Sequence, residues 1–454
     1  MSEKLGFKEV VAMGVGGMVS GGIFAVLGVA MQQAGNTVPV SFLIAGAITL
    51  LTAYSYIKLT LYYGENGGAF SFIEHTVENR HIAGFFGWVL IVGYIGVMAM
   101  YAFAFGAYTA GFFELGANSI YRKLISAGIV AGLVGMNLVG VRETGLLEDV
   151  LVYLKAAFLF AIAGIGIFLF DGSYPDIFAG LIQDPVNPVV GFAVIFVAYE
   201  GFQLLCYDYS DIKNVEKNLE YGMYTAIVTA ILVYVSVSYM ATLHLTPQMI
   251  AQHKEYALAK AVTPYLGQLG FALVVVTAIQ STASGINATL FGSSRLAHRI
   301  ATEKELPRVF SFRNRKGIPT YALLITGSLT VVFTWFGSLE QITEFGSVAF
   351  LVADGAANFA NLRLYEKTDS NPLIPLLGFT GTLVALPIVI HHLYVTEPTT
   401  LLHIVSIFTA LIVFEFLYLE REPIENEVEK MEEEAERVEE EVKQEVHDLE
   451  DRDS

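Results

Sequence analysis

Long apolar segments recur along this chain of 454 residues, and they limit its fold more than any other feature. Runs of 18 or more apolar residues are long enough to cross the hydrocarbon core of a bilayer as helices. Only 15% of the residues are charged, whereas a soluble chain of this length carries about 25%. We therefore predict an all-α integral membrane protein and reject a soluble enzyme.

Twelve transmembrane helices are predicted, with both termini in the cytoplasm. Alternating these spans places seventeen Lys and Arg residues inside and four outside, counted up to Arg421, as the positive-inside rule requires. The segment 245–267 is too polar to cross and is expected to form a helical external loop. The predicted spans are 10–32, 38–62, 82–113, 124–141, 147–170, 188–207, 222–243, 268–294, 319–337, 343–364, 373–394 and 399–419.

The chain divides into a twelve-span membrane domain over 1–419 and an acidic cytoplasmic tail over 420–454. The tail holds 17 acidic and 5 basic residues, so it repels anionic lipid headgroups. A weak 4-3-4-3 apolar spacing runs through it. We expect a solvated segment, helical or disordered, and the alternative is a coiled coil or an arm that docks a protein partner.

Adjacent glycines interrupt the first span. The stretch GVGGMVSGGIFAVLG, 14–28, holds six glycines, each of which costs roughly 1 kcal/mol in a helix interior. Close helix packing accounts for single glycines, but two adjacent glycines cannot share one packing face. A discontinuous helix accounts for them better, because unpaired backbone at this depth is tolerated where it lines a cavity or meets a ligand.

A break near Ser20 offers both halves of a site for a zwitterion. The amides of Gly21, Gly22 and Ile23 would begin a second half-helix, whose dipole favours a carboxylate. The carbonyls just before the break can accept hydrogen bonds from an ammonium group. This pattern fits an α-amino acid better than a sugar or a peptide.

A second break is expected in the sixth span, five spans after the first. There Glu200 and Gly201 lie in the middle of an apolar run, and a charged residue at that depth is costly unless it is paired or wetted. The spacing of the two breaks is typical of a 5+5 inverted repeat.

Four segments resemble the amino acid–polyamine–organocation (APC) superfamily over about residues 6–419. They are VSGGIF in the first span, with Ser20 in place of a glycine; GENGGAFSFIEHTVENRHIAGFFGW after the second; AYEGF with SDIKNVEKNLE around the end of the sixth; and NATLFGSSRLAHRIATEKELP after the eighth. The resemblance implies the fold of sodium-coupled leucine transporters, with spans one and six broken around a central substrate. A bundle of spans 1, 2, 6 and 7 would then rock against a scaffold that includes spans 3, 4, 8 and 9.

Lys155 lies about nine residues into the fifth span. It can snorkel to the interface or point inward. The sequence is most similar to the archaeal proton-coupled branch typified by ApcT. In that branch a lysine of span five occupies the position where related transporters bind sodium. That resemblance implies that Lys155 meets the Gly16 carbonyl and a hydroxyl of Ser281, Thr282 or Ser284. Desolvation helps a lysine to release its proton, so Lys155 is the predicted proton-coupling residue.

Several roles are open to Glu200. It can contact the ammonium or a cationic side chain of the substrate, act as a second proton site, pair with Lys155, or face a wet vestibule. Aromatic residues of the third and sixth spans are candidates to gate the site. The predicted substrate-binding residues are Ser20, Gly21, Gly22, Ile23, Tyr101, Phe196, Tyr199, Glu200 and Phe202.

The prediction is a multi-pass cell-membrane protein that acts as a secondary active amino acid transporter, by proton symport with alternating access. No enzymatic activity, metal, cofactor or nucleic acid is expected, and the partners are an amino acid, protons and the lipid bilayer. One alternative is an amino acid or polyamine exchanger. Another is a non-transporting receptor or scaffold that signals through the acidic tail. Sodium coupling is disfavoured, because Lys155 and sodium would compete for one place.

Overall fold

The computed structural model describes residues 4–77, 79–116, 119–140 and 145–418. The chain forms two compact units, Met1–Val405 and Ser406–Ser454. The helices α1 to α16 all belong to the first unit. The predicted acidic tail lies outside the described residues.

Most of the described residues are helical, and among them the pairing between Leu5 and Ile212 is an isolated bridge. Short 3-10 turns join several of the helices. The α-helices are α1 Phe7–Met18, α2 Gly22–Ala34, α3 Val38–Tyr63, α4 Gly68–Thr76, α5 Arg80–Phe112, α6 Ile120–Val139, α7 Gly145–Phe168, α8 Ile177–Gln183, α9 Asn187–Ile195, α10 Leu204–Tyr207, α11 Val215–His244, α12 Pro247–His253, α13 Ala257–Thr302, α14 Thr320–Phe336, α15 Leu339–Arg363 and α16 Leu373–Thr396.

Every predicted span coincides with helical structure in the described residues, which confirms the all-α membrane class. Within the described residues, nine segments are long and apolar enough to cross a membrane, and one of them, Gly22–Tyr63, contains both α2 and α3. The number of twelve crossings stays a prediction. The helix of the eighth span is longer than expected, since α13 begins at Ala257 and passes a kink at Gly267, which has φ 61°.

Polar side chains mark where several helices begin. Ser119 accepts a hydrogen bond from the Arg122 amide at 3.3 Å at the start of α6. Ser338 and Gln341 bond reciprocally to each other's backbone at the start of α15. Such caps satisfy amides that the first turn of a helix cannot pair.

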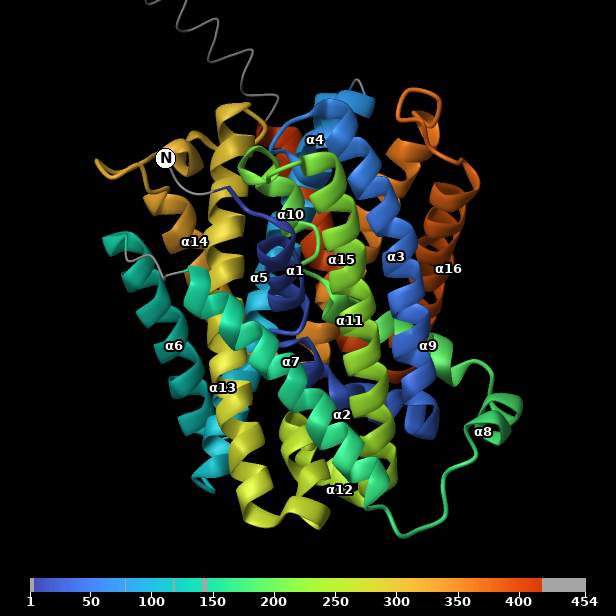
Figure 1. Cartoon of the computed structure of the whole chain (residues 1–454). Coiled ribbons are helices and arrows are strands. Elements are labelled where there is room, and N and C mark those ends of the chain that lie inside the picture. Colours follow the sequence, from blue (N-terminus) through green and yellow to red (C-terminus); the bar gives the residue numbers. More distant parts are fainter. Residues whose placement is uncertain (1–3, 78, 117–118, 141–144, 419–454) are drawn as a thin grey trace, which may run out of the picture. The chain divides into compact units, whose positions relative to one another are not determined.

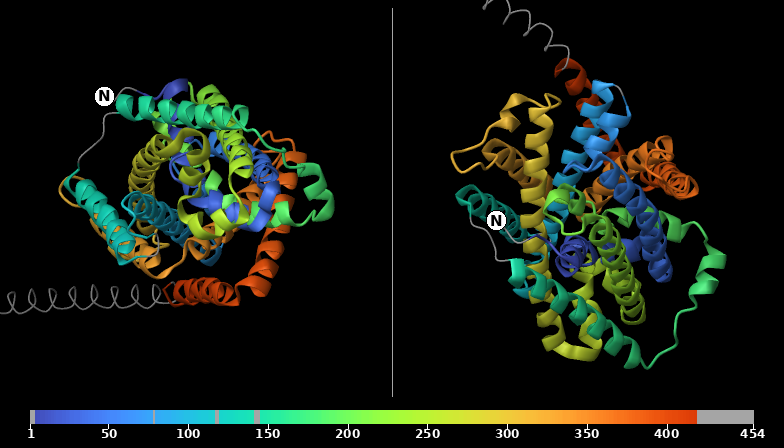
Figure 2. Two further views of the ribbon diagram at one scale, coloured as in Figure 1. Left: turned by 90° about the horizontal axis from the view of Figure 1, so that it is seen from below. Right: turned by 45° about the horizontal axis from the view of Figure 1, so that its top comes forward.

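Most of the helices run in roughly one direction, so the view from below shows many of them end on (Figures 1 and 2). α5 lies among them and packs against α13, α15, α6 and α14. In the segment Asn187–Tyr207, which holds α9 and α10, 89% of an apolar 18-residue window is buried, against 28% of the window in Ile120–Val139. The sixth predicted span is therefore central, and α6 is peripheral.

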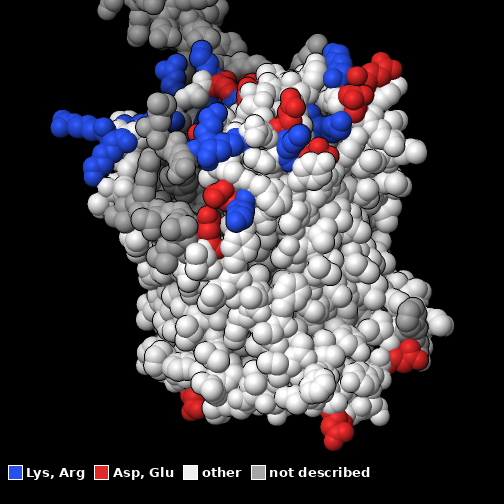
Figure 3. Space-filling model, in the orientation of Figure 1, with Lys and Arg blue, Asp and Glu red and all other residues white. Residues whose placement is uncertain are grey.

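Charged residues are distributed unevenly between the two ends of the molecule, along the direction in which most of the helices run. On the face shown in Figure 3, Lys and Arg gather at the end that lies near the N-terminus. A broad band below that end is uncharged, and a few acidic residues mark the opposite end. This pattern matches a chain with one strongly basic end, as the Lys and Arg count predicted.

Candidate functional site

The first membrane helix is interrupted at the predicted place. α1 ends and α2 begins on either side of residues 19–21. The first hydrogen bond of α2 runs from Ala25 N to Gly21 O at 2.9 Å. Because the first amides of a helix lack an intrahelical acceptor, the N–H groups of Gly22 and Ile23 lie at a buried helix N-terminus, where the dipole favours an anion.

Hydroxyl groups contact the carbonyls at the end of α1. Ser20 Oγ donates to Gly17 O at 2.8 Å, and the Tyr234 hydroxyl of α11 donates to Met18 O at 2.6 Å. The same Tyr234 oxygen lies 2.9 Å from Ala198 O in the sixth span. A hydroxyl has one proton to donate, so Tyr234 can pass its hydrogen bond between the two interrupted helices.

The sixth span unwinds at Glu200. A 3-10 turn, η2 (Phe196–Tyr199), ends just before it, and Gly201 then takes φ 124°. The Gly201 amide donates to Gln203 Oε1 at 2.8 Å, and the Gln203 side-chain amide donates to the Glu200 carboxylate. The Gln203 side chain therefore hydrogen-bonds both the Gly201 amide, which has no helical partner among the described residues, and the buried Glu200 carboxylate.

The two interruptions touch each other through glycine backbone. A Cβ built on Gly201 would lie 2.8 Å from Gly17 Cα, and one built on Gly17 would lie 2.8 Å from Gly201 O. A Cβ on Gly22 would lie 2.7 Å from Ala198 O and 2.8 Å from the Tyr234 hydroxyl. These separations leave no room for a side chain at any of the three glycines.

Two further helices close around the first break. The Tyr101 ring of α5 lies directly against Gly21, and its hydroxyl is 3.5 Å from Gly17 O. A Cβ on Gly285 of α13 would lie 2.8 Å from both Ser20 Cβ and the Tyr101 ring. The structure thus brings together four of the predicted substrate-binding residues, namely Ser20, Gly21, Gly22 and Tyr101.

The aromatic residues of the sixth span have other contacts. The Tyr199 hydroxyl donates to Phe42 O of α3 at 2.8 Å, and the Phe202 ring lies 5.3 Å from the Tyr56 ring of the same helix. Phe196 packs on a neighbouring ring of its own span. These contacts pack the three side chains around the second break.

Lys155 lies buried on α7, with 5% of its surface exposed. One turn earlier on the same helix, Val152 touches α1, because a Cβ on Gly16 would lie 3.0 Å from Val152 Cγ2. Residues three apart share a helix face, so the face of α7 that carries Lys155 packs toward the end of α1.

The three predicted hydroxyl partners of Lys155 lie on α13, which contacts both α1 and α7. Among the residues that the structure describes, the buried Ser281 Oγ has no hydrogen-bond partner. Thr282 Oγ1 donates to Ala278 O of its own helix at 2.7 Å. Ser284 is partly exposed and directly precedes Gly285, which packs against the first break.

Sequence reasoning missed three residues at the breaks: Tyr234, Gly285 and Ser347. Ser347 Oγ of α15 accepts from the Val197 amide at 3.2 Å and donates to Val194 O at 2.5 Å, which satisfies backbone freed by the turn into η2. A buried hydroxyl in an apolar span needs a hydrogen-bond partner. The position of Tyr234 in the run TAILVYVSVSYM could therefore have indicated a hydrogen bond inside the membrane.

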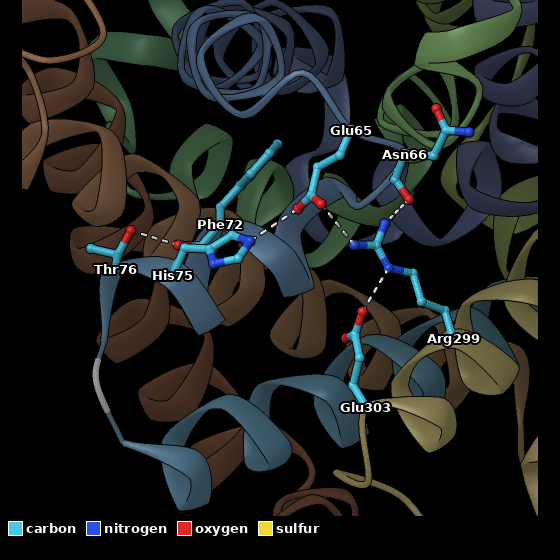
Figure 4. A network of polar contacts seen from close by, with 7 residues as sticks. All are labelled: Glu65, Asn66, Phe72, His75, Thr76, Arg299 and Glu303. Atoms are coloured by element: carbon cyan, nitrogen blue, oxygen red, sulfur yellow. Dashed lines mark hydrogen bonds and ion pairs between the residues drawn. The ribbon is translucent and has the colours of Figure 1, made fainter.

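At the basic end, an ion-pair network joins α13 to the connection between α3 and α4 (Figure 4). Arg299 Nη2 lies 3.3 Å from Glu65 Oε2, and Arg299 Nε donates to Glu303 Oε1 at 3.0 Å. Arg299 also donates to Asn66 O, and His75 Nε2 lies 3.1 Å from Glu65 Oε1. The guanidinium is thus the centre of the network.

Other contacts cross the opposite end. Lys254 lies in the 3-10 turn η4 (Lys254–Tyr256), directly after α12, and its ammonium pairs with Glu340 at the start of α15. The backbone of Lys254 lies directly against Gly28 of α2. In this conformation, polar contacts therefore bridge the helices on both sides of the breaks.

Residues 5–422 match the family model for amino acid permeases. The chain is 28% identical to an uncharacterised protein of Methanocaldococcus jannaschii, MJ0609, over 92% of this chain and 95% of that protein. It is 28% identical to the inner membrane transport protein YbaT of Escherichia coli over 87% and 90% of the two chains. It is also 25% identical to the branched-chain amino acid permease BcaP of Lactococcus lactis over 83% and 87%. The family match spans almost the entire sequence, and this chain belongs to the amino acid permeases, as its broken first and sixth helices lead one to expect.

Proposed function

We propose that this protein is a proton-coupled amino acid symporter of the cell membrane that works by alternating access. The observation that carries the proposal is the buried break of the first helix. There the N-terminus of α2 and the terminal carbonyls of α1 are separated by only residues 19–21. The amide end suits a carboxylate and the carbonyl end suits an ammonium, so one break recognises the groups that all α-amino acids share.

Binding in this site requires side chains to move. Gly17 O and Met18 O accept hydrogen bonds from Ser20 and Tyr234. A substrate ammonium would replace these hydroxyl donors, and Tyr234 can then turn to Ala198 O, which lies 2.9 Å away. Substrate binding would in this way alter the contact between the two interrupted helices.

Lys155 is the proposed proton carrier. Its burial on the α7 face that packs toward Gly16 supports this role over snorkelling. A lysine in an apolar environment exchanges its proton more readily than one in water. Ser281 Oγ on α13, which has no partner among the described residues, is available to accept from the ammonium in another conformation. Protonated Lys155 would then hold α1 against the scaffold, and deprotonation would release it.

The gathering of Lys and Arg near the N-terminus supports a cytoplasmic location for that end. Transport would then run from the end that carries α12 toward the end that carries α4 (Figure 1). We propose neutral amino acids as substrates, in keeping with the name of the Lactococcus relative, a branched-chain amino acid permease.

The test is uptake of a radiolabelled amino acid panel into proteoliposomes, with and without an imposed pH gradient. Uptake should follow the proton gradient, and Lys155→Ala should abolish that dependence. Lys217→Ala on the exposed surface of α11 is the matched control and should transport normally. Unchanged pH-driven uptake in Lys155→Ala would remove Lys155 from the mechanism. Counterflow without a proton gradient that strictly requires internal substrate would identify an exchanger, and stimulation by sodium would reject proton coupling.

A further inference from the structure

Two buried carboxyl groups, Glu200 at the second break and Asp354 on α15, each have one oxygen without a hydrogen-bond partner in the part of the chain that the structure describes. Their side chains are 1% and 0% exposed. Glu200 uses one oxygen to accept from Gln203, and Asp354 uses one to accept from the Tyr56 hydroxyl at 2.9 Å. Within the described residues, the other oxygen of each acid, Glu200 Oε1 and Asp354 Oδ2, has no hydrogen-bond partner.

The two acids belong to one cluster. The Tyr56 ring that holds Asp354 also packs at 5.3 Å from the ring of Phe202, two residues beyond Glu200. The two carboxyl groups are close enough to interact electrostatically with each other.

The groups around the pair are hydroxyls rather than cations. The titratable groups that interact with the two acids come from α3, α5 and α10, and all of them are tyrosines: Tyr56, Tyr94, Tyr101 and Tyr207. In the described part of the chain, the interactions that either acid makes with charged groups are only with the other acid. Two negative charges without a cation are very costly at this depth.

We propose that Glu200 and Asp354 together form a proton-binding site, separate from Lys155. Like two carboxylates that share one site, they accommodate one negative charge but not two. The bound proton satisfies one of the unpartnered oxygens and lets the second break lie against α15. Loss of that proton would push the break of the sixth span away from α15, a movement that Lys155 does not control.

The cluster also extends toward the basic end of the molecule. The Tyr94 and Tyr207 hydroxyls lie 3.1 Å apart, and Tyr207 is followed by Asp208. The Asp208 side chain is 25% exposed and lies 3.8 Å from Arg295 Nη1. These hydroxyls give the pair a polar route toward solvent at that end.

Infrared spectroscopy of the full chain in lipid tests the proposal without any transport. The readout is the carbonyl stretch of protonated carboxyl groups at neutral pH. Glu200→Gln and Asp354→Asn should each reduce it by one carboxyl, and the double variant should reduce it no further, because the pair holds one proton. The band should persist in Lys155→Ala, so the result is independent of the symport proposal.

Glu344→Gln is the matched control, since Glu344 is a buried acid elsewhere on α15 with both oxygens unpartnered among the described residues. Any loss that it causes should add to the loss from either pair variant. An unchanged band in both single variants would overturn the proposal. Losses that add in the double variant would also overturn it, because they would indicate two independent acids. A wild-type pH titration of the band serves the same purpose if one variant fails to fold.

Discussion

Gly17 and Gly201, from helices five spans apart, meet backbone to backbone at the two helix breaks. A Cβ on either glycine would lie 2.8 Å from a backbone atom of the other. The two unwound segments therefore form one joint, in which a shift of the first helix is transmitted directly to the sixth. Interiors are close-packed, so such a joint changes by switching between arrangements rather than by gradual deformation.

Gly201→Ala should disrupt this joint strongly. The residue has φ 124°, where an L side chain is strained, and the new Cβ would overlap Gly17. Strained backbone of this kind costs on the order of 1–3 kcal/mol, so the melting temperature in detergent and the uptake rate should both fall. Gly128→Ala on α6 is the control, because a Cβ there meets nothing within 4 Å and alanine favours the helix. Equal behaviour of the two variants would contradict the joint.

Tyr234→Phe should weaken the fold without weakening substrate affinity, because the substrate ammonium replaces this hydroxyl at Met18 O. The variant leaves Met18 O and Ala198 O without their shared donor, and a buried polar group without a partner costs about 1–3 kcal/mol. We expect the melting temperature in detergent to fall, while the KM for uptake stays at or below the wild-type value. Tyr239→Phe, five residues further along α11, is the matched control. A KM that rises about tenfold, which corresponds to ~1.4 kcal/mol, would show instead that the hydroxyl helps to hold the substrate.

The breaks were predictable from sequence because their cause is local. Adjacent glycines at 21 and 22, and Glu200 beside Gly201, disfavour a continuous helix whatever surrounds them. The residues that contact the breaks were not predictable in the same way. Tyr234 lies 216 residues from Met18 along the chain, and Gly285 matters only because it abuts Ser20 and Tyr101. Such contacts arise from how α5, α11 and α13 pack, and spacing along the chain does not encode them.

Glu74→Gln should stabilise the protein relative to the wild type, and this gain in stability should increase as the pH rises. Glu74 lies on α4, where burial raises its pKa above the usual value of 4.5 and the neighbouring Glu303 raises it further. Between the ordinary and the raised pKa, the folded state binds more protons than the unfolded state, so wild-type stability falls as pH rises through this window. The melting temperature of the variant should match the wild type below about pH 4 and exceed it increasingly toward neutral pH. Glu220→Gln, on the exposed surface of α11, should show no such trend, and a trend common to both variants would reject the assignment.

Arg299→Ala should open the basic end of the protein. It removes the ion pair with Glu65 that holds α13 to the connection between α3 and α4, and the pair with Glu303 at the end of α13 itself. Cys206 on α10 is the only cysteine in the sequence and is buried, so its reaction with a maleimide reports opening nearby. Loss of about 1 kcal/mol from a partly exposed network should raise the labelling rate roughly fivefold. Arg363→Ala, at the exposed end of α15, controls for the loss of a positive charge. An accelerated reaction in Arg299→Ala alone would identify the network as a barrier to opening, whereas equal rates in both variants and the wild type would show that α13 stays in place without it.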